Sequence, residues 1–439
     1  MTGAELAARA SARLQRCLAV LNSVDGIERR GRLVRVTGGL LTSAGPTVGQ
    51  GQWCRVGDDA LAEVVGFRDG LTLLAPLENG QRYAPGQVVE ALGRDGWVWC
   101  GPGMLGRVLN EFGAPVDGEP MWSASVVRHL GHAAPMPLQR PAIVEPLPTG
   151  VRAIDALCTL GRGQRVGLFA GSGVGKSTLL GMAARGTDAD VVVCCLIGER
   201  GREVGEYLEI LRSALDRTVV VATTSDRPPI CRARCADTAM TIAEYFREQG
   251  KNVLLLMDSL TRYCQALREI GLAAGESPAA RGYPPSVFSS LPQLLERAGR
   301  TESGSITLIA TVLVDGDDMD EPVADAARGL LDGHIILSRR MAERGQYPPV
   351  DVPASVSRLM PAVTNRDVQQ AARAGRAALS RAEETADLIA MGAYRRGADP
   401  DLDAALDISG RLRAWLCQAP EEFSSWGDTM SELFTAVSG

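Results

Sequence analysis

The sequence predicts an α/β fold, with a central parallel sheet, a small β-barrel before it and a helical domain after it. The middle of the chain alternates long apolar runs with helical stretches, which is typical of strands buried in a parallel sheet. The part before it has short β-rich runs between turns, and the final part is rich in Ala and Arg. We expect a helical N-terminal arm (1–28), a β-barrel domain (29–95), the sheet domain (96–360) and a helical C-terminal domain (361–439).

Composition is typical of a soluble globular protein. The 439 residues are 45% hydrophobic and 22% charged, which excludes a mainly disordered chain, a collagen and a small disulfide scaffold. No run of about 18 apolar residues is present, and no charged segment followed by an apolar core marks a secretory signal. We therefore expect the protein to stay in the cytosol where it is made. The formal net charge of −6 argues against a broad basic surface for nucleic acid.

The N-terminal segment 4–23 has the periodicity of an amphipathic helix. Leu6, Leu14, Leu18 and Leu21 lie roughly on one face of it. This arm either packs on its own domain or contacts a partner or a membrane surface, and the residues favour neither alternative.

Short β-rich runs separated by Gly and Asp turns follow, and they predict a small barrel. The runs are Leu33–Val36, Glu63–Phe67, Leu71–Leu74 and Val88–Leu92. Residues 101–150 are rich in Gly and Pro and are interpreted as an ordered connector.

Five nearly continuous apolar runs predict the strands of the parallel sheet, because strands buried on both faces show no alternation. They are Arg165–Ala170, Val191–Ile197, Thr218–Thr223, Val253–Asp258 and Ile306–Val314. After about residue 362 the chain is helical, with turns at Gly397 and Pro400 and near Pro420.

A glycine-rich loop joins the first of these strands to the next helix. It reads Gly171-Ser172-Gly173-Val174-Gly175-Lys176-Ser177-Thr178. Glycines let backbone N–H groups turn inward around phosphate oxygens, and the helix N-terminus adds a favourable dipole. Lys176 can reach the β- and γ-phosphates, and Ser177 can ligate Mg²⁺. Ala170 stands where this pattern usually begins with Gly, but it ends the strand and leaves the loop intact.

Two acidic residues at strand ends complete the predicted site. Asp258 ends a buried strand and would hold Mg²⁺, through water or together with Ser177. Hydrolysis also needs a group that polarises the attacking water, and Ser259 rather than an acid follows Asp258. Glu199 follows the apolar run Val191–Ile197 and is the best candidate. Ligands of α/β sheets bind at the carboxyl ends of strands, where the phosphate loop also lies. The alternative for Glu199 is a solvated charge at a helix start.

These segments together resemble the catalytic subunits of rotary and secretion ATPases, which are P-loop NTPases with a RecA-like sheet. The resemblance rests on the phosphate loop, on Gly198-Glu199-Arg200 and on residues 256–262. Further stretches are similar to the type III secretion branch. They are residues 148–155, 281–288, 317–322 and 331–339.

The resemblance implies Mg²⁺-dependent ATP hydrolysis that powers type III protein secretion by an injectisome. It implies a homohexamer with active sites between subunits, which unfolds substrates and releases them from chaperones. The implied partners are stator and central-stalk proteins, the export gate and chaperone–substrate complexes, with no nucleic acid. The implied location is the cytoplasm, at the periphery of the inner-membrane export apparatus.

The resemblance also assigns roles to single residues. Glu199 is implied to be the catalytic glutamate, with Arg200 as its neighbour in the site and Arg262 near the γ-phosphate. Tyr347 is implied to stack on adenine, and Arg358 to be an arginine finger that reaches the next subunit's site. Non-catalytic relatives carry Gln in place of the glutamate, so Glu199 indicates an active enzyme.

Four alternatives remain open. The first is the flagellar export ATPase, although residues 266–276 favour the injectisome. The second is a rotary ATP synthase subunit, which the export-type stretches disfavour. The third is a Rho-like nucleic-acid motor, which the net charge and the lack of an aromatic cluster in the barrel disfavour. The fourth is a scaffold that binds nucleotide without hydrolysis.

Overall fold

The structure is a computed structural model that describes residues 29–123, 125–314 and 318–438. The expected N-terminal arm lies outside these residues. The chain divides into two compact units, one holding the barrel and the other the large sheet and the C-terminal helices. Across the described ranges, no helix combines the length and the hydropathy that crossing a membrane requires.

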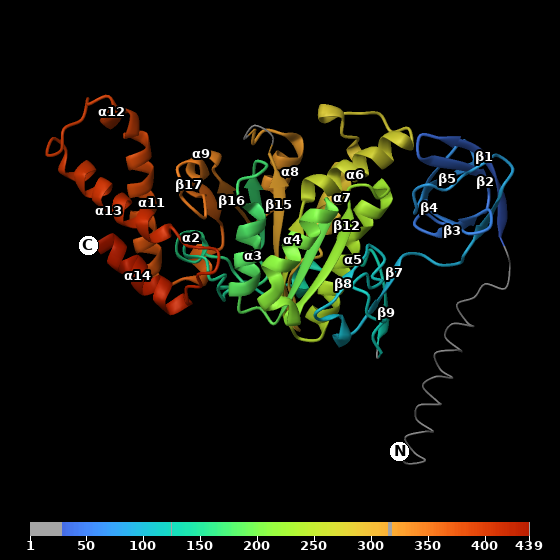
Figure 1. Ribbon diagram of the computed structural model, residues 1–439, viewed down its shortest axis with the longest axis horizontal. Coiled ribbons are helices and arrows are strands. Elements are labelled where there is room, and N and C mark those ends of the chain that lie inside the picture. Colours follow the sequence, from blue (N-terminus) through green and yellow to red (C-terminus); the bar gives the residue numbers. More distant parts are fainter. Residues whose placement is uncertain (1–28, 124, 315–317, 439) are drawn as a thin grey trace, which may run out of the picture. The chain divides into compact units, whose positions relative to one another are not determined.

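Six antiparallel strands close into the expected barrel, drawn in blue in Figure 1. They are β1 (Arg30–Thr37), β2 (Leu40–Ala44), β3 (Trp53–Val56), β4 (Ala60–Arg68), β5 (Leu71–Pro76) and β6 (Val88–Ala91), in the order β1-β2-β5-β4-β3-β6. Leu33, Leu41, Val64, Leu74 and Val89 fill the interior. All four predicted β-rich runs lie in or overlap these strands.

The large sheet confirms the predicted α/β class. Its strand order is β17-β16-β10-β15-β13-β11-β12-β8, with β14 paired to β15. The strands are β8 (Val108–Leu109), β10 (Arg165–Ala170), β11 (Val191–Glu199), β12 (Thr218–Thr224), β13 (Asn252–Asp258), β14 (Gly299–Arg300), β15 (Ser305–Leu313), β16 (Gly333–Leu337) and β17 (Val350–Ser357). The five long central strands run parallel and are almost wholly buried, which explains their unbroken apolar runs.

Helices and short pieces connect the strands of this unit. The α-helices are α2 (Arg152–Leu157), α3 (Lys176–Gly186), α4 (Gly201–Leu211), α5 (Pro229–Glu248), α6 (Leu260–Ala273), α7 (Pro285–Leu295), α8 (Pro322–Leu330) and α9 (Arg339–Glu343). The short 3-10 helices are η1 (Pro102–Met104), η2 (Pro137–Gln139), η3 (Arg212–Arg217) and η4 (Ala280–Gly282). A separate two-stranded ribbon pairs β7 (Trp97–Cys100) with β9 (Val126–His129).

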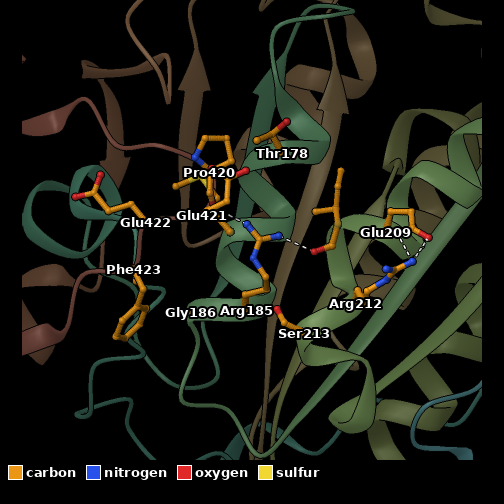
Figure 2. Close-up of a pocket in the computed structure, with 13 residues that line it drawn as sticks. Thr178, Arg185, Gly186, Glu209, Arg212, Ser213, Pro420, Glu421, Glu422 and Phe423 are labelled. Atoms are coloured by element: carbon orange, nitrogen blue, oxygen red, sulfur yellow. Dashed lines mark hydrogen bonds and ion pairs between the residues drawn. The ribbon is translucent and has the colours of Figure 1, made fainter.

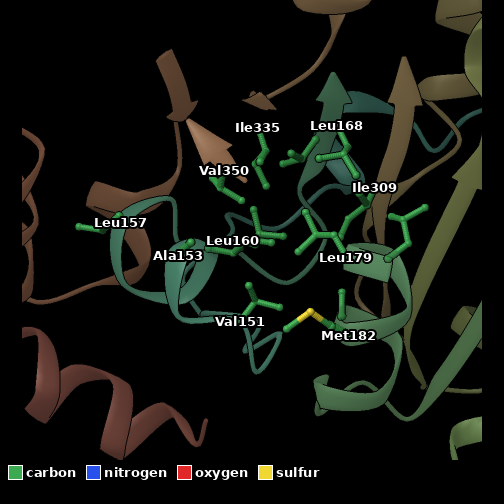
Figure 3. Packing of buried hydrophobic residues seen from close by; sticks show 14 of the residues in the cluster. Val151, Ala153, Leu157, Leu160, Leu168, Leu179, Met182, Ile309, Ile335 and Val350 are labelled. Carbon is green, nitrogen blue, oxygen red and sulfur yellow. The ribbon is translucent and has the colours of Figure 1, made fainter. Parts of the chain in front are cut away.

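The main core lies between the sheet and α3 (Figure 3). Leu168, Ile309 and Ile335 project from three adjacent strands, and Leu179 and Met182 meet them from α3. All five side chains are buried, so this packing fixes the helix that follows the phosphate loop.

Five helices form the C-terminal region, drawn in orange-red and red in Figure 1. They are α10 (Met360–Val363), α11 (Arg366–Glu384), α12 (Ala386–Ala390), α13 (Pro400–Leu416) and α14 (Trp426–Ser438). The Asn365 side chain caps α11 by accepting from the Val368 N–H at 2.9 Å. Arg376 of α11 donates to the carbonyls of Leu157 at 3.1 Å and Ser355 at 2.5 Å, which ties α11 to α2 and β17.

Candidate active site

The phosphate loop connects the end of β10 to the start of α3. Gly173 and Gly175 have φ of 78° and 94°, a left-handed conformation that other residues rarely adopt. A Cβ at either glycine would meet no atom of the described residues within 4 Å, so the backbone conformation and not crowding requires glycine there. Such a turn directs backbone N–H groups into a concave nest. The 11-residue α3 begins at the same point, so the positive end of its helix dipole also faces the nest. The loop is therefore built to bind phosphate.

The structure brings Lys176, Asp258 and Glu199 together. Glu199 ends β11 and Asp258 ends β13, and the two strands are neighbours with Leu196 opposite Asp258. Lys176 Nζ donates a hydrogen bond to Asp258 Oδ1 and lies 4.0 Å from Glu199 Oε1. The predicted cation and both predicted acids thus share one edge of the sheet, beside the loop.

The surroundings of Asp258 fit a magnesium ion bound with nucleotide. Asp258 is 2% exposed, and Thr311 Oγ1 donates to its Oδ1 at 2.7 Å. Ser177 begins α3 beside Lys176, so a hydroxyl and a carboxylate are available, which are the hard oxygen ligands that Mg²⁺ takes. The described residues contain no group of three or more His, Cys, Asp or Glu that could cage a metal alone. Mg²⁺ typically uses one or two carboxylates and completes its shell with phosphates and water.

Glu199 is suited to act as a base. It is 7% exposed, and Arg262 Nε lies 3.3 Å from its Oε1. Within the described part of the chain this buried oxygen accepts no hydrogen bond, and the Arg262 and Lys176 cations lie beside it. Burial raises the pKa of Glu199 to about 7, helped by a hydrogen bond with Glu203 and by the charge of Asp258. A carboxyl that titrates near neutral pH can both accept and release a proton there.

Arg200 and Arg358 lie outside this cluster. The Arg200 side chain is 79% exposed and pairs with Glu203 at 2.9 Å. Arg358 is exposed and follows β17, whose Ser357 pairs with Gly333 at the amino end of β16. The phosphate loop follows the carboxyl end of the parallel β10, so Arg358 lies at the opposite edge of the sheet from its own loop.

A cavity of about 460 Å³ adjoins the start of α3. Gly175 and Thr178 line it on one side, and Tyr347 and Gln418 line it on the other. The Tyr347 side chain is half exposed at this cavity, and its backbone carbonyl accepts from the Gln418 N–H at 2.9 Å. An aromatic ring next to a phosphate loop can stack on a nucleotide base. We call this cavity the base pocket.

A second cavity of about 710 Å³ shares Thr178, Met182 and Pro420 with the base pocket (Figure 2). Arg185 of α3 donates to the Ile210 carbonyl at 2.6 Å and to the Pro420 carbonyl at 2.5 Å. Arg185 therefore fixes the loop that forms the wall between the two cavities.

Two residues near the site, Arg232 and Arg339, were not predicted from the sequence. A Cβ on Gly198 would lie 3.2 Å from Arg232 Cδ and 3.5 Å from Arg262 Cδ, so both arginines approach the strand that carries Glu199. Arg339 donates to the Ser172 carbonyl of the phosphate loop at 3.0 Å. Arg232 follows β12 in the chain and Arg339 follows β16, and this position after a strand was the only signal that the sequence offered. The order of strands in the sheet decides which of the residues after strands reach the site.

Two family profiles match most of the chain after the barrel. A profile of the ATP synthase alpha/beta family, nucleotide-binding domain, matches residues 150–357, and one of the T3SS EscN ATPase C-terminal domain matches residues 364–435. The chain is 49% identical to a type 3 secretion system ATPase of Xanthomonas euvesicatoria, over 93% of this chain and 94% of the relative. It is 45% identical to a flagellum-specific ATP synthase of Bacillus subtilis, over 95% and 97% of the two chains.

Solved structures of similar fold come from enteropathogenic E. coli. The assembled type III secretion ATPase EscN superposes with a TM-score of 0.89 at 42% identity, covering 93% of this chain and all of that one. EscN in complex with its central stalk EscO gives a TM-score of 0.86 at the same identity and coverage.

Proposed function

The chain belongs to the family of type III secretion and flagellar export ATPases, and from that premise we propose that it hydrolyses Mg²⁺-ATP as a homohexamer to power type III protein secretion. The observation that carries this proposal is the cluster of Lys176, Asp258 and Glu199 beside a phosphate loop. It supplies the cation, the metal ligand and the base that hydrolysis of a phosphoanhydride needs.

We assign each step of binding to groups of this chain. The N–H groups of residues 171–176 and the α3 N-terminus hold the phosphates, and Lys176 exchanges its pairing with Asp258 for the β- and γ-phosphates. Asp258 and Ser177 would hold Mg²⁺, which would neutralise charge that develops on the phosphates. Tyr347 stacks on the base.

Glu199 orients the attacking water and takes its proton, a role for which its raised pKa suits it. Arg262, next to Glu199, stabilises charge on the transferred phosphoryl group. Arg200 pairs with Glu203 in solvent, so a role for it in the site requires its side chain to move.

The proposal of a hexamer rests on the place of Arg358. An arginine finger cannot reach its own phosphate loop from the opposite edge of the sheet, but it can reach the loop of the next subunit in a ring. EscN has been solved both assembled and with its central stalk, and we propose the same kind of assembly here. Stator proteins, the export gate and chaperone–substrate complexes are the further proposed partners, at the cytoplasmic side of the inner membrane.

Flagellar protein export is the second candidate function. Flagellum-specific relatives reach 45% to 47% identity and secretion relatives 44% to 49%, so identity alone does not separate the branches. The chemistry at the site is the same in both cases.

The test of this proposal is the Glu199→Gln variant. It removes the base but keeps the size of the side chain, so binding of Mg²⁺-ATP should stay within about twofold of wild type while turnover falls by a factor of about 100 or more. Equilibrium binding of a fluorescent ATP analogue and steady-state phosphate release measure the two quantities. Wild-type turnover in this variant would remove Glu199 from the mechanism.

A further inference from the structure

We propose that Arg339 is a positioning residue for the phosphate loop. Its guanidinium holds the Ser172 carbonyl on the outer side of the loop, at 3.0 Å, and so keeps the next N–H turned toward the phosphates. This inference rests on the proposed nucleotide site and adds to it a residue that makes no contact with the base pocket.

The strand register places Arg339 beside the loop. β16 pairs with β10 in parallel, with Leu337 opposite Ala170, and both strands end at these residues. Two residues further along each chain stand Arg339 and Ser172, at the same edge of the sheet. The contact therefore follows from the topology of the sheet as well as from the position of one exposed side chain.

The geometry of the peptide bond explains why this contact matters. The carbonyl of Ser172 and the N–H of Gly173 belong to one peptide plane, and in a trans peptide they point in opposite directions. A donor that fixes the Ser172 carbonyl outward thus aims the Gly173 N–H inward. Gly173 has φ of 78°, and among the described residues no atom outside its chain neighbours lies within 4 Å of its Cβ position, so side-chain packing at that point does not fix the peptide.

Arg339 also links the loop to the segment that carries Tyr347. It is the first residue of α9, and the Ser338 N–H just before it donates to the Pro349 carbonyl at 2.9 Å. At the other end of α9, the Gln346 N–H donates to the Met341 carbonyl at 3.0 Å. The phosphate end and the base end of the site are therefore held by the same short helix.

The neighbouring arginine provides a matched control. Arg340 stands next to Arg339 on α9, but its guanidinium pairs with Glu383 of α11 and does not contact the loop. Replacing each arginine by Met keeps the apolar stem and removes the donors, so the two variants differ mainly in whether the Ser172 carbonyl loses its partner.

The experiment measures the dissociation constants of ADP and of inorganic tripolyphosphate by titration calorimetry, with Mg²⁺ present. In Arg339→Met both ligands should bind about fivefold to twentyfold more weakly, because both use the loop. Arg339→Lys, which keeps one donor, should recover part of the loss, and Arg340→Met should stay within about twofold of wild type. In turnover, KM for ATP should rise in Arg339→Met while kcat changes little.

Two results would overturn the inference. One is wild-type affinity for tripolyphosphate in an Arg339→Met chain that melts at the wild-type temperature. The other is an equal loss in Arg340→Met, which would mean that α9 acts only through stability. If Arg339→Met does not fold, the same binding measurements are made on Arg339→Lys and Arg340→Lys. The inference is overturned if Arg339→Lys binds tripolyphosphate as tightly as wild type, or if both variants lose affinity equally. Lys176→Ala separates this inference from the proposed function, because unchanged binding of both ligands in that variant would contradict the nucleotide site itself.

Discussion

At the scale of single residues, the positive charge of Lys176 offsets the negative charge of the acids around it. Lys176 pairs with Asp258, which is 2% exposed, and both lie beside Glu199. A buried carboxylate without a counter-charge is costly, so pairing with Lys176 stabilises the Asp258 carboxylate. If Mg²⁺-ATP binds as proposed, Lys176 must exchange its contact with Asp258 for the phosphates, and Asp258 must turn to Mg²⁺.

A double-mutant cycle tests this pairing. Lys176→Met should lower the free energy of unfolding by about 2–4 kcal/mol, because it leaves the Asp258 carboxylate unpaired. Adding Asp258→Asn should recover at least half of that loss, since a neutral amide needs no counter-charge. Urea unfolding of the wild type, the two single variants and the double variant, without nucleotide, gives the coupling free energy between Lys176 and Asp258. If the losses of unfolding free energy in the two single variants simply add in the double variant, the ion pair contributes nothing to stability.

The pKa of Glu199 predicts a pH dependence. Burial and the hydrogen bond with Glu203 raise this pKa to about 7, and only the ionised carboxylate can accept a proton. Hence kcat/KM, which reports the free enzyme, should fall about tenfold per pH unit below that value. Glu203→Ala removes one cause of the raised pKa, so the midpoint should move to lower pH. Glu206→Ala, one turn further along α4, should leave the midpoint in place, and an unmoved midpoint in Glu203→Ala would contradict the assignment.

At the scale of elements, the loop of residues 417–420 forms one wall of the base pocket, and Arg185 of α3 holds it by the Pro420 carbonyl. Arg185→Met should free this wall, raise KM for ATP about threefold to tenfold and leave kcat nearly unchanged. Arg212→Met is the matched control in the same cavity, because Arg212 is 75% exposed and pairs with Glu209. Equal KM values in the two variants would refute this role of Arg185.

The strands and the phosphate loop could be predicted because each has a local cause. Strands buried on both faces are apolar throughout, and a nest of N–H groups needs glycines at Gly173 and Gly175. The role of Arg339 could not be predicted, because it depends on β16 pairing with β10, and Arg339 and Ser172 are 167 residues apart. Arg232 was missed for the same reason. The order of strands in a sheet is a property of the whole fold, not of any segment.

At the scale of the whole molecule, the proposed catalytic groups of one chain lie at opposite ends of its sheet. The phosphate loop and Glu199 lie at the carboxyl edge of the sheet, and Arg358 lies at the amino edge. A ring of identical subunits can join these edges, because a head-to-tail interface repeats the same contact around the ring. Under the proposed function, catalysis requires this joining.

Mixing two inactive variants tests whether the subunits share active sites. Glu199→Gln chains keep Arg358, and Arg358→Ala chains keep Glu199, so each variant alone should lose turnover. After co-assembly at equal concentrations, about a quarter of the interfaces combine an intact Glu199 with an intact Arg358, and ATPase activity should reappear. It should also rise with total protein concentration. A co-assembled mixture that remains as inactive as its parts, or an Arg358→Ala hexamer with wild-type turnover, would contradict active sites shared between subunits.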